Sequence, residues 1–135
     1  MQSWLRAYGA AWEQRNAQAA VDLFAEDAVY FVLPFSAPIC GRQELLKYWK
    51  HVTSSQEQIQ FDFEILAAGP AESVAHWRAS FVLPSERKRL ELDGICVVSL
   101  NSEGRCTRFW GCWHKREIML PSCANRTAGA AWPVL

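Results

Sequence analysis

The chain has 135 residues, the length of one domain that can bury a real hydrophobic core. Its 14 Lys and Arg residues balance 14 Asp and Glu residues, so no net field favours nucleic acid or an anionic membrane surface. No apolar run approaches the roughly 18 residues of a membrane span, and no signal-peptide core precedes Glu13 and Arg15.

The N-terminal third predicts three helices and one strand. Apolar and aromatic side chains recur at helical spacing over residues 2–15, which indicates an amphipathic helix. Asn16 can cap a second helix, in which apolar residues extend as far as Phe24. Asp27 then leads into AVYFVL, a buried strand that Pro34 ends. A third helix opens at Gly41, and one of its sides carries Leu45, Trp49 and Val52.

Beyond this point the period changes to that of strands. QIQFDFEI alternates without a break, residues 73–83 and 87–100 form two long segments, and residues 105–116 give a final strand. Helices followed by an antiparallel meander predict an α+β fold, with three N-terminal helices packed on one face of a curved sheet. Leu90 and Leu92 set one alternation phase and Ile95 and Val97 the other, so we expect a β-bulge at Gly94.

The domain is expected to cover residues 1–117. Residues 118–135 lose periodicity and contain Pro121, Gly129 and Pro133, which predicts an irregular tail, loosely ordered or draped over a partner subunit. The five cysteines lack Cys-x-x-Cys spacing, which favours reduced thiols in a cytoplasmic protein over disulfides or a zinc site. No phosphate loop or metal-ligand cluster is apparent, so we expect neither a cofactor nor a metal.

From Trp4 to Glu117 the order of motifs resembles a known family. The segments WLRAYGAAW, LFAEDAVY, GRQELLKYW, AHWRASF, ELDGICVVSLNSEGRC and the closing WH are similar to SnoaL-like proteins of the nuclear transport factor 2-like superfamily. This resemblance implies a cone of strongly bent antiparallel sheet closed by three helices, often a homodimer, around an apolar pocket. Isomerases, cyclases, hydratases, epoxide hydrolases and non-catalytic binders share that fold, so the fold alone does not set the function.

The resemblance also implies positions for site residues. By similarity to ketosteroid isomerases, Tyr8 matches an oxyanion-hole tyrosine, but Val32 or Leu33 occupies the position of the aspartate base. Cys96 matches the second oxyanion-hole acid, with Asp93 three residues away.

Limonene-type epoxide hydrolases give a second comparison. It matches Tyr30 to a pocket tyrosine and keeps an arginine at Arg78. It places Val32, Ser80 and Gly111 where those enzymes carry an asparagine and two aspartates. Both reference mechanisms are therefore incomplete here.

Three functional hypotheses follow. The leading one is a homodimeric binder of a small apolar molecule with one polar handle. Its pocket is expected to be walled by Trp12, Tyr30, Val32, Trp49 and Trp113, with Tyr8, His76 and Arg78 supplying hydrogen bonds to the ligand. Ser80 and Gly111 are also expected to bind the ligand. The second is a cofactor-free isomerase, cyclase or hydratase, in which Asp93 moves a proton and Tyr8 or Arg78 stabilises an oxyanion. The third is a dimeric interaction module whose cavity is filled by its own tryptophans.

Two orientations remain open at this stage. Arg78 shares a strand face with His76 and Ser80, and that face is either pocket interior, or solvent or dimer rim. Asp93 either points inward, where desolvation would suit it to acid–base work, or outward as a surface residue.

Overall fold

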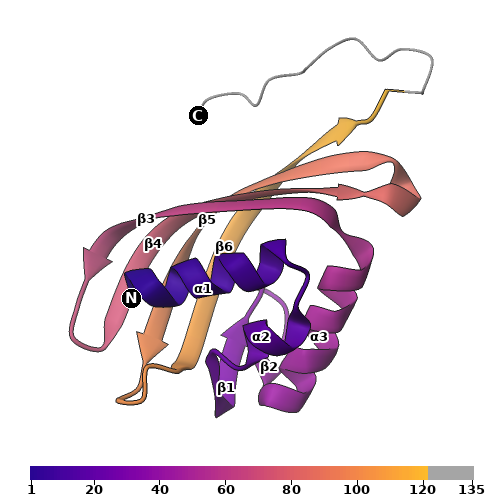
Figure 1. Cartoon of the computed structure of the whole chain (residues 1–135). Helices are drawn as coiled ribbons and strands as arrows, with labels where there is room; N and C mark the ends of the chain where they lie inside the picture. The colour runs from indigo at the N-terminus through magenta and orange to yellow at the C-terminus, as the bar shows by residue number, and fades with distance from the viewer. Residues whose placement is uncertain (122–135) are drawn as a thin grey trace.

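A computed structural model describes residues 1–121 of the chain (Figure 1). Two helices and two strands precede the third helix, and four long strands follow it. In chain order the elements are α1 (Gln2–Glu13), α2 (Ala17–Val21), β1 (Phe24–Phe31), β2 (Ile39–Cys40), α3 (Arg42–Ser55), β3 (Glu57–Ala68), β4 (Glu72–Leu83), the 3₁₀ turn η1 (Pro84–Glu86), β5 (Lys88–Leu100) and β6 (Cys106–Met119).

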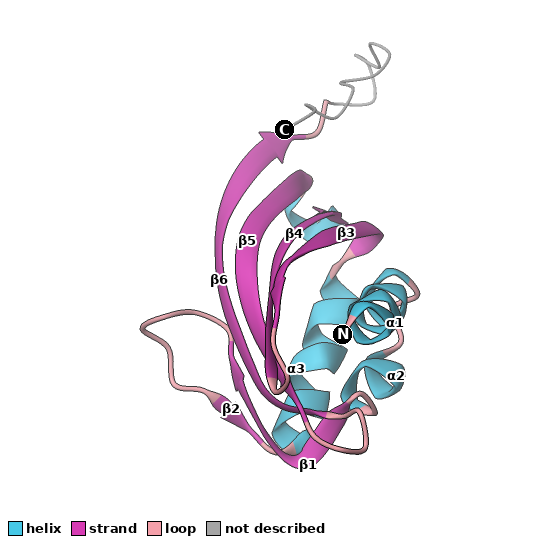
Figure 2. Cartoon of the chain, turned by 90° about the vertical axis from the view of Figure 1, so that its left-hand side faces the viewer, coloured by secondary structure: helices cyan, strands magenta, loops and turns pink. Residues whose placement is uncertain are grey.

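The six strands form one curved sheet in the order β2-β1-β6-β5-β4-β3. Its neighbours are antiparallel except for β1 and β6, which run parallel. Figure 2 shows the sheet bending around the helices, which all lie on its concave side. Within residues 1–121, β2 and β3 are the two edges of the sheet and do not pair with each other, so the sheet does not close. The predicted α+β class, with helices on one face of a curved sheet, is confirmed.

Helix α1 buries the predicted aromatic stripe, because Trp4, Tyr8 and Trp12 all face the sheet and are almost fully covered. The Asn16 side chain caps α2 by accepting a hydrogen bond from the Ala19 N–H at 3.0 Å. The second helix is shorter than predicted, since it ends at Val21 and Phe24 begins β1. The reason is tertiary pairing with β6, in which the Cys106 N–H donates to the Leu23 carbonyl at 2.9 Å.

The predicted bulge at Gly94 is wrong, because β5 stays in continuous register with both β4 and β6 through this residue. Leu92, Gly94 and Cys96 belong to one buried phase, while Ile95 lies on the opposite face. Instead, the absence of a side chain at Gly94 allows β5 and β6 to pack closely. A Cβ at this position would lie 2.5 Å from the Cys112 carbonyl oxygen and 2.7 Å from the Trp113 Cβ.

Strand β6 runs to Met119, two residues beyond the predicted domain boundary. The expectation of an irregular tail falls mostly on residues 122–135, which lie outside the described residues. Within residues 1–121, no helix is both long and apolar enough to cross a membrane.

Candidate functional site: a cavity between the helices and the sheet

A cavity of about 170 Å³ lies between the helices and the concave face of the sheet. Every long element of the fold contributes to its wall, and most of the contributing side chains are apolar or aromatic. The wall consists of Leu5, Tyr8, Trp12, Tyr30, Phe31, Val32, Tyr48, Trp49, Val52, Gln56, Phe61, Trp77, Phe81, Leu90, Leu92, Cys96, Phe109, Gly111 and Trp113. This list contains no Asp, Glu, His, Lys or Arg among the described residues, so the described wall carries no formal charge at neutral pH.

A pair of tyrosines supplies the main polar feature of the wall. The phenolic oxygens of Tyr8, on α1, and Tyr30, on β1, lie 2.9 Å apart, and both side chains are buried. Burial raises the pKa of each phenol well above its ordinary value, so both stay protonated. One hydroxyl donates to the other within the pair. The accepting tyrosine therefore keeps one O–H that can donate to a further acceptor.

The other polar groups in the wall are the Gln56 amide, the tryptophan indole N–H groups and the Cys96 thiol. The Trp12 indole N–H donates to Gln56 Oε1 at 2.7 Å, which ties the end of α1 to the end of α3. The indole N–H groups of Trp49 and Trp77 are buried and have no hydrogen-bond partner among the described residues. Burial raises the pKa of the Cys96 thiol to about 12, so it too is neutral. The polar part of this wall consists chiefly of neutral donors.

Seven of the predicted site residues line this cavity: Tyr8, Trp12, Tyr30, Val32, Trp49, Gly111 and Trp113. The other four, His76, Arg78, Ser80 and Asp93, do not. On β4, the side chains of Ala75, Trp77 and Ala79 are buried on the helix side. Strand alternation therefore places His76, Arg78 and Ser80 on the opposite, convex face.

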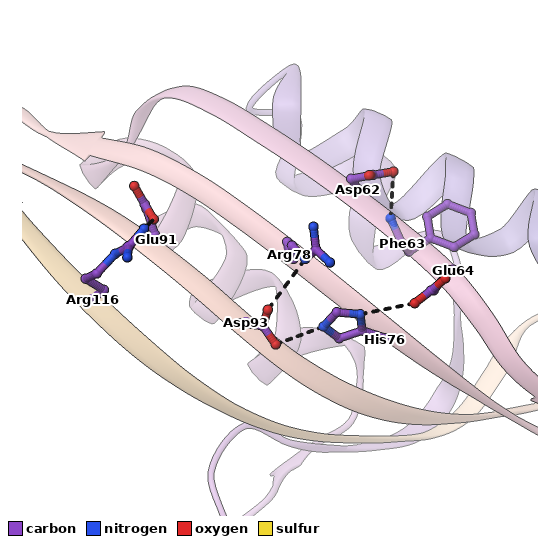
Figure 3. A network of polar contacts seen from close by, with 8 residues as sticks. All are labelled: Asp62, Phe63, Glu64, His76, Arg78, Glu91, Asp93 and Arg116. Atoms are coloured by element: carbon purple, nitrogen blue, oxygen red, sulfur yellow. Dashed lines mark hydrogen bonds and ion pairs between the residues drawn. The ribbon is translucent and has the colours of Figure 1, made fainter. Parts of the chain in front are cut away.

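Asp93 lies on this convex face as well, within a polar network that Figure 3 shows. His76 Nε2 is 2.8 Å from Asp93 Oδ1, and His76 Nδ1 is 3.4 Å from Glu64 Oε1. The Arg78 Nε atom is 3.5 Å from Asp93 Oδ2. The expected convergence of Tyr8, Arg78 and Asp93 on one cavity is therefore corrected, because the sheet separates the tyrosine from the other two. Arg78 and Asp93 satisfy each other's charge at a half-exposed surface.

No grouping of His, Cys, Asp and Glu side chains among residues 1–121 has the arrangement needed to hold a metal ion. Neither the cavity nor the convex network therefore provides a described metal site. The chemistry open to the cavity is that of an apolar, uncharged compartment with hydrogen-bond donors.

Comparison with known protein families identifies the family to which the chain belongs. A sequence profile of the SnoaL-like domain matches residues 5–109. The chain belongs to the SnoaL-like family. A search among curated proteins finds no match.

Solved structures share the fold of this SnoaL-like domain. One of them is SalBIII, an epoxide hydrolase/cyclase-like enzyme in pyran ring formation in the polyether salinomycin. It superposes with a TM-score of 0.74 at 16% sequence identity, and the match covers 84% of this chain and 89% of SalBIII. Rv0760c from Mycobacterium tuberculosis superposes with a TM-score of 0.76 at 13% sequence identity. The match covers 86% of this chain and 94% of Rv0760c. A candidate isomerase from Bacillus subtilis superposes with a TM-score of 0.73 at 16% sequence identity. The match covers 84% of this chain and 85% of the isomerase chain. At these identities the likeness establishes the fold alone.

Gly111 leaves room for a methyl group in the wall of this SnoaL-like domain. A Cβ built there would lie 3.4 Å from the Phe109 ring and 3.5 Å from the Phe31 carbonyl oxygen, so packing does not require a glycine. The residue pairs with Cys96 across β5 and β6 on the concave face. The absent side chain therefore widens the cavity at the position where the resemblance implied an acid.

Several wall residues were not among the predicted site residues, notably Tyr48, Gln56, Phe61, Trp77 and Phe109. Phe61 belongs to the alternation that correctly predicted the inner side of β3. Trp77 belongs to the apolar phase of β4, which in the sequence is less conspicuous than the polar phase formed by His76, Arg78 and Ser80. The apolar phase was the signal that identifies the concave face. Gln56 had no such signal, because its role depends on Trp12, which lies 44 residues earlier in the chain.

Proposed function

We propose that this SnoaL-like domain binds a small, neutral, largely apolar molecule that carries a hydrogen-bond acceptor. The observation that supports this most is the Tyr8–Tyr30 hydroxyl pair in the wall of an otherwise apolar, uncharged cavity. Such pockets bind by apolar contact and use a few placed polar groups to orient the ligand. A carbonyl or ether oxygen is the complementary handle, because it accepts the one free phenolic hydrogen.

The volume supports a ligand of modest size. A cavity of about 150 Å³ in another protein holds benzene, so about 170 Å³ suits a molecule with one six-membered ring. A rigid polycyclic molecule would need the surrounding rings to move apart. The Trp12 ring packs against both Trp49 and Phe61, each with a centroid distance of 5.8 Å, which makes such movement costly.

The charge of the wall argues for a neutral ligand. A carboxylate or ammonium group that entered would lose its hydration and find no described counter-ion in the wall. The same feature weighs against the catalytic alternative. Proton transfer by a side chain works best when its pKa lies near the working pH, whereas burial raises the pKa of Tyr8, Tyr30 and Cys96 far from neutrality. Binding without chemistry is therefore the function we favour.

Calorimetry with matched six-membered rings tests this proposal. Cyclohexanone carries the acceptor, methylenecyclohexane has the same shape without it, and cyclohexanecarboxylate adds a charge. We expect cyclohexanone to bind most tightly, and Gly111→Leu, which fills the cavity, to abolish its binding. Tighter binding of the carboxylate, or binding that Gly111→Leu leaves unchanged, would contradict the proposal.

We also infer that the protein acts as a homodimer in the cytoplasm, without nucleic-acid or membrane partners. The exposed free thiols of Cys40 and Cys112 fit a reducing compartment, and the balanced charge favours neither class of polyanionic partner. Fractionation of cells that express the full chain tests the location.

A further inference from the structure

Two of the buried tryptophans present an indole N–H that has no acceptor. Trp4, Trp12, Trp49 and Trp77 are each at most 7% exposed. The Trp4 N–H donates to a backbone carbonyl at 2.9 Å, and the Trp12 N–H donates to a side-chain amide oxygen at 2.7 Å. The N–H groups of Trp49 and Trp77 have no such partner within residues 1–121, although both side chains line the cavity. An indole N–H can only donate, so each of the two calls for an acceptor from outside the described chain.

Gln56 adds a further donor to the same wall. Its Oε1 atom accepts the hydrogen of the Trp12 indole, and this bond fixes the orientation of the amide because an indole nitrogen cannot accept. The part of the amide that remains for another partner is therefore the Nε2 group, which donates. Gln56 lines the cavity together with Trp49 and Trp77, so the polar groups that these three residues offer to a ligand are all N–H donors.

These donors surround Trp12, one helical turn away from the tyrosine pair. The Trp12 ring lies 5.8 Å from the Trp49 ring and 6.3 Å from the Trp77 ring, measured between centroids, and its N–H reaches Gln56. We call Trp49, Gln56 and Trp77 the indole end of the cavity. Trp12 follows Tyr8 by four residues on α1, which is about 6 Å along the helix axis. The Trp49 ring also contacts the Tyr8 ring at 5.4 Å, so one six-membered ring can span from the tyrosine pair to the indole end.

We propose that the ligand is a neutral ring compound with two acceptor oxygens on opposite sides of the ring. The tyrosine pair binds one oxygen and the indole end binds the other. This inference rests on the proposed function and extends it from one acceptor to two. Carbonyl oxygens suit both positions because they accept hydrogen bonds and bring no hydrogen of their own, whereas an alcohol or amine at the indole end would bring a hydrogen that meets only N–H donors. The ligand class is therefore that of cyclic dicarbonyl compounds.

Calorimetry of the unmodified full chain with two matched rings tests the second acceptor. Cyclohexane-1,4-dione carries both oxygens, and 4-methylenecyclohexanone has the same outline with one oxygen only. We expect the dione to bind about tenfold more tightly, because its second oxygen gains hydrogen bonds in the wall. Equal affinities, or tighter binding of 4-methylenecyclohexanone, would overturn the second acceptor and leave the proposed function standing. Failure of both ketones to bind would overturn both proposals.

Nuclear magnetic resonance of the indole N–H groups locates the second oxygen. The chain has seven tryptophans, and a Trp→Phe variant at each position assigns its signal. The N–H proton of Trp49 or Trp77 is expected to lie further downfield in the dione complex than in the 4-methylenecyclohexanone complex, because a hydrogen bond deshields it. Trp4 and Trp12 are internal controls, since their N–H groups already have acceptors. Signals of Trp49 and Trp77 that coincide in the two complexes would overturn the placement at the indole end.

Discussion

The Tyr8 and Tyr30 hydroxyls meet at 2.9 Å although 22 residues separate them in the chain. One comes from the first helix and the other from the first strand, and Phe109 of the last strand stacks against both rings, with centroid distances of 5.5 and 4.8 Å. Three distant segments of the chain therefore fix the position of this pair. Its rigidity is what suits it to present one hydrogen to a ligand.

A double-mutant cycle on this pair separates its two roles. Tyr8→Phe or Tyr30→Phe alone leaves a buried hydroxyl without its partner, and each is expected to lower the free energy of unfolding by about 1 kcal/mol. The double variant removes both hydroxyls and is expected to be closer to wild-type stability than the sum of the singles. Urea unfolding measures this, and strictly additive losses would show that the pair is not coupled.

The same variants test the ligand handle. Each single variant keeps one donor, so we expect cyclohexanone affinity to fall only slightly. The double variant loses both and is expected to bind cyclohexanone about tenfold more weakly, while methylenecyclohexane binds as before. Calorimetry measures both ligands, and equal losses for the two would point to a change of cavity shape instead.

Gly94 on β5 and Gly111 on β6 are expected to respond differently to substitution by alanine. Gly94→Ala forces a methyl group against the Cys112 carbonyl and the Trp113 Cβ, and it is expected to cost about 1–3 kcal/mol of stability. Gly111→Ala meets its nearest neighbour at 3.4 Å and is expected to change stability by less than about 1 kcal/mol. Thermal unfolding compares them, and an equal loss at both positions would refute the assignment of space at Gly111.

Asp93→Asn tests the separation of the convex network from the cavity. Asp93 is about half exposed, and its partners His76 and Arg78 lie on the same face. We expect cyclohexanone affinity to stay unchanged and stability to fall by no more than about 1 kcal/mol, as for other exposed ion pairs. Loss of binding by a well-folded Asp93→Asn protein would restore a role for this carboxylate at the ligand site.

Stability is expected to decline at alkaline pH. Burial raises the pKa of Cys96 and Cys106 from an ordinary 9.0 to about 12 in the folded protein. Above pH 9 the unfolded chain releases these protons while the folded chain keeps them, so the free energy of unfolding falls as the pH rises from about 9 toward about 12. Cys96→Ala should make this decline shallower in urea unfolding at several pH values, and an unchanged slope would contradict it.

Periodicity in the sequence was enough to predict the helices, the long strands and the concave aromatic wall formed by Tyr8, Trp12 and Trp49. Those residues sit in patterns whose apolar phase is unmistakable. The α+β class followed from the order of the elements, and the resemblance that indicated the family is confirmed by the match over residues 5–109.

Periodicity did not predict in the same way which side chains of β4 and β5 lie on the concave face of the sheet. On β4, alanines at 75 and 79 make the concave phase look weak, whereas His76, Arg78 and Ser80 form a conspicuous polar set. On β5, Ile95 and Val97 are apolar although they lie on the convex face, and they mimic a change of phase at Gly94. A strand that is apolar on both faces gives no alternation from which to infer its orientation.

A crystal structure of the protein soaked with cyclohexanone tests the central claim most directly. The account predicts one ring within the cavity, with its carbonyl oxygen at hydrogen-bond distance from the hydroxyl of Tyr8 or Tyr30. A ring bound at the convex face beside His76 and Arg78, with the cavity left empty, would contradict it.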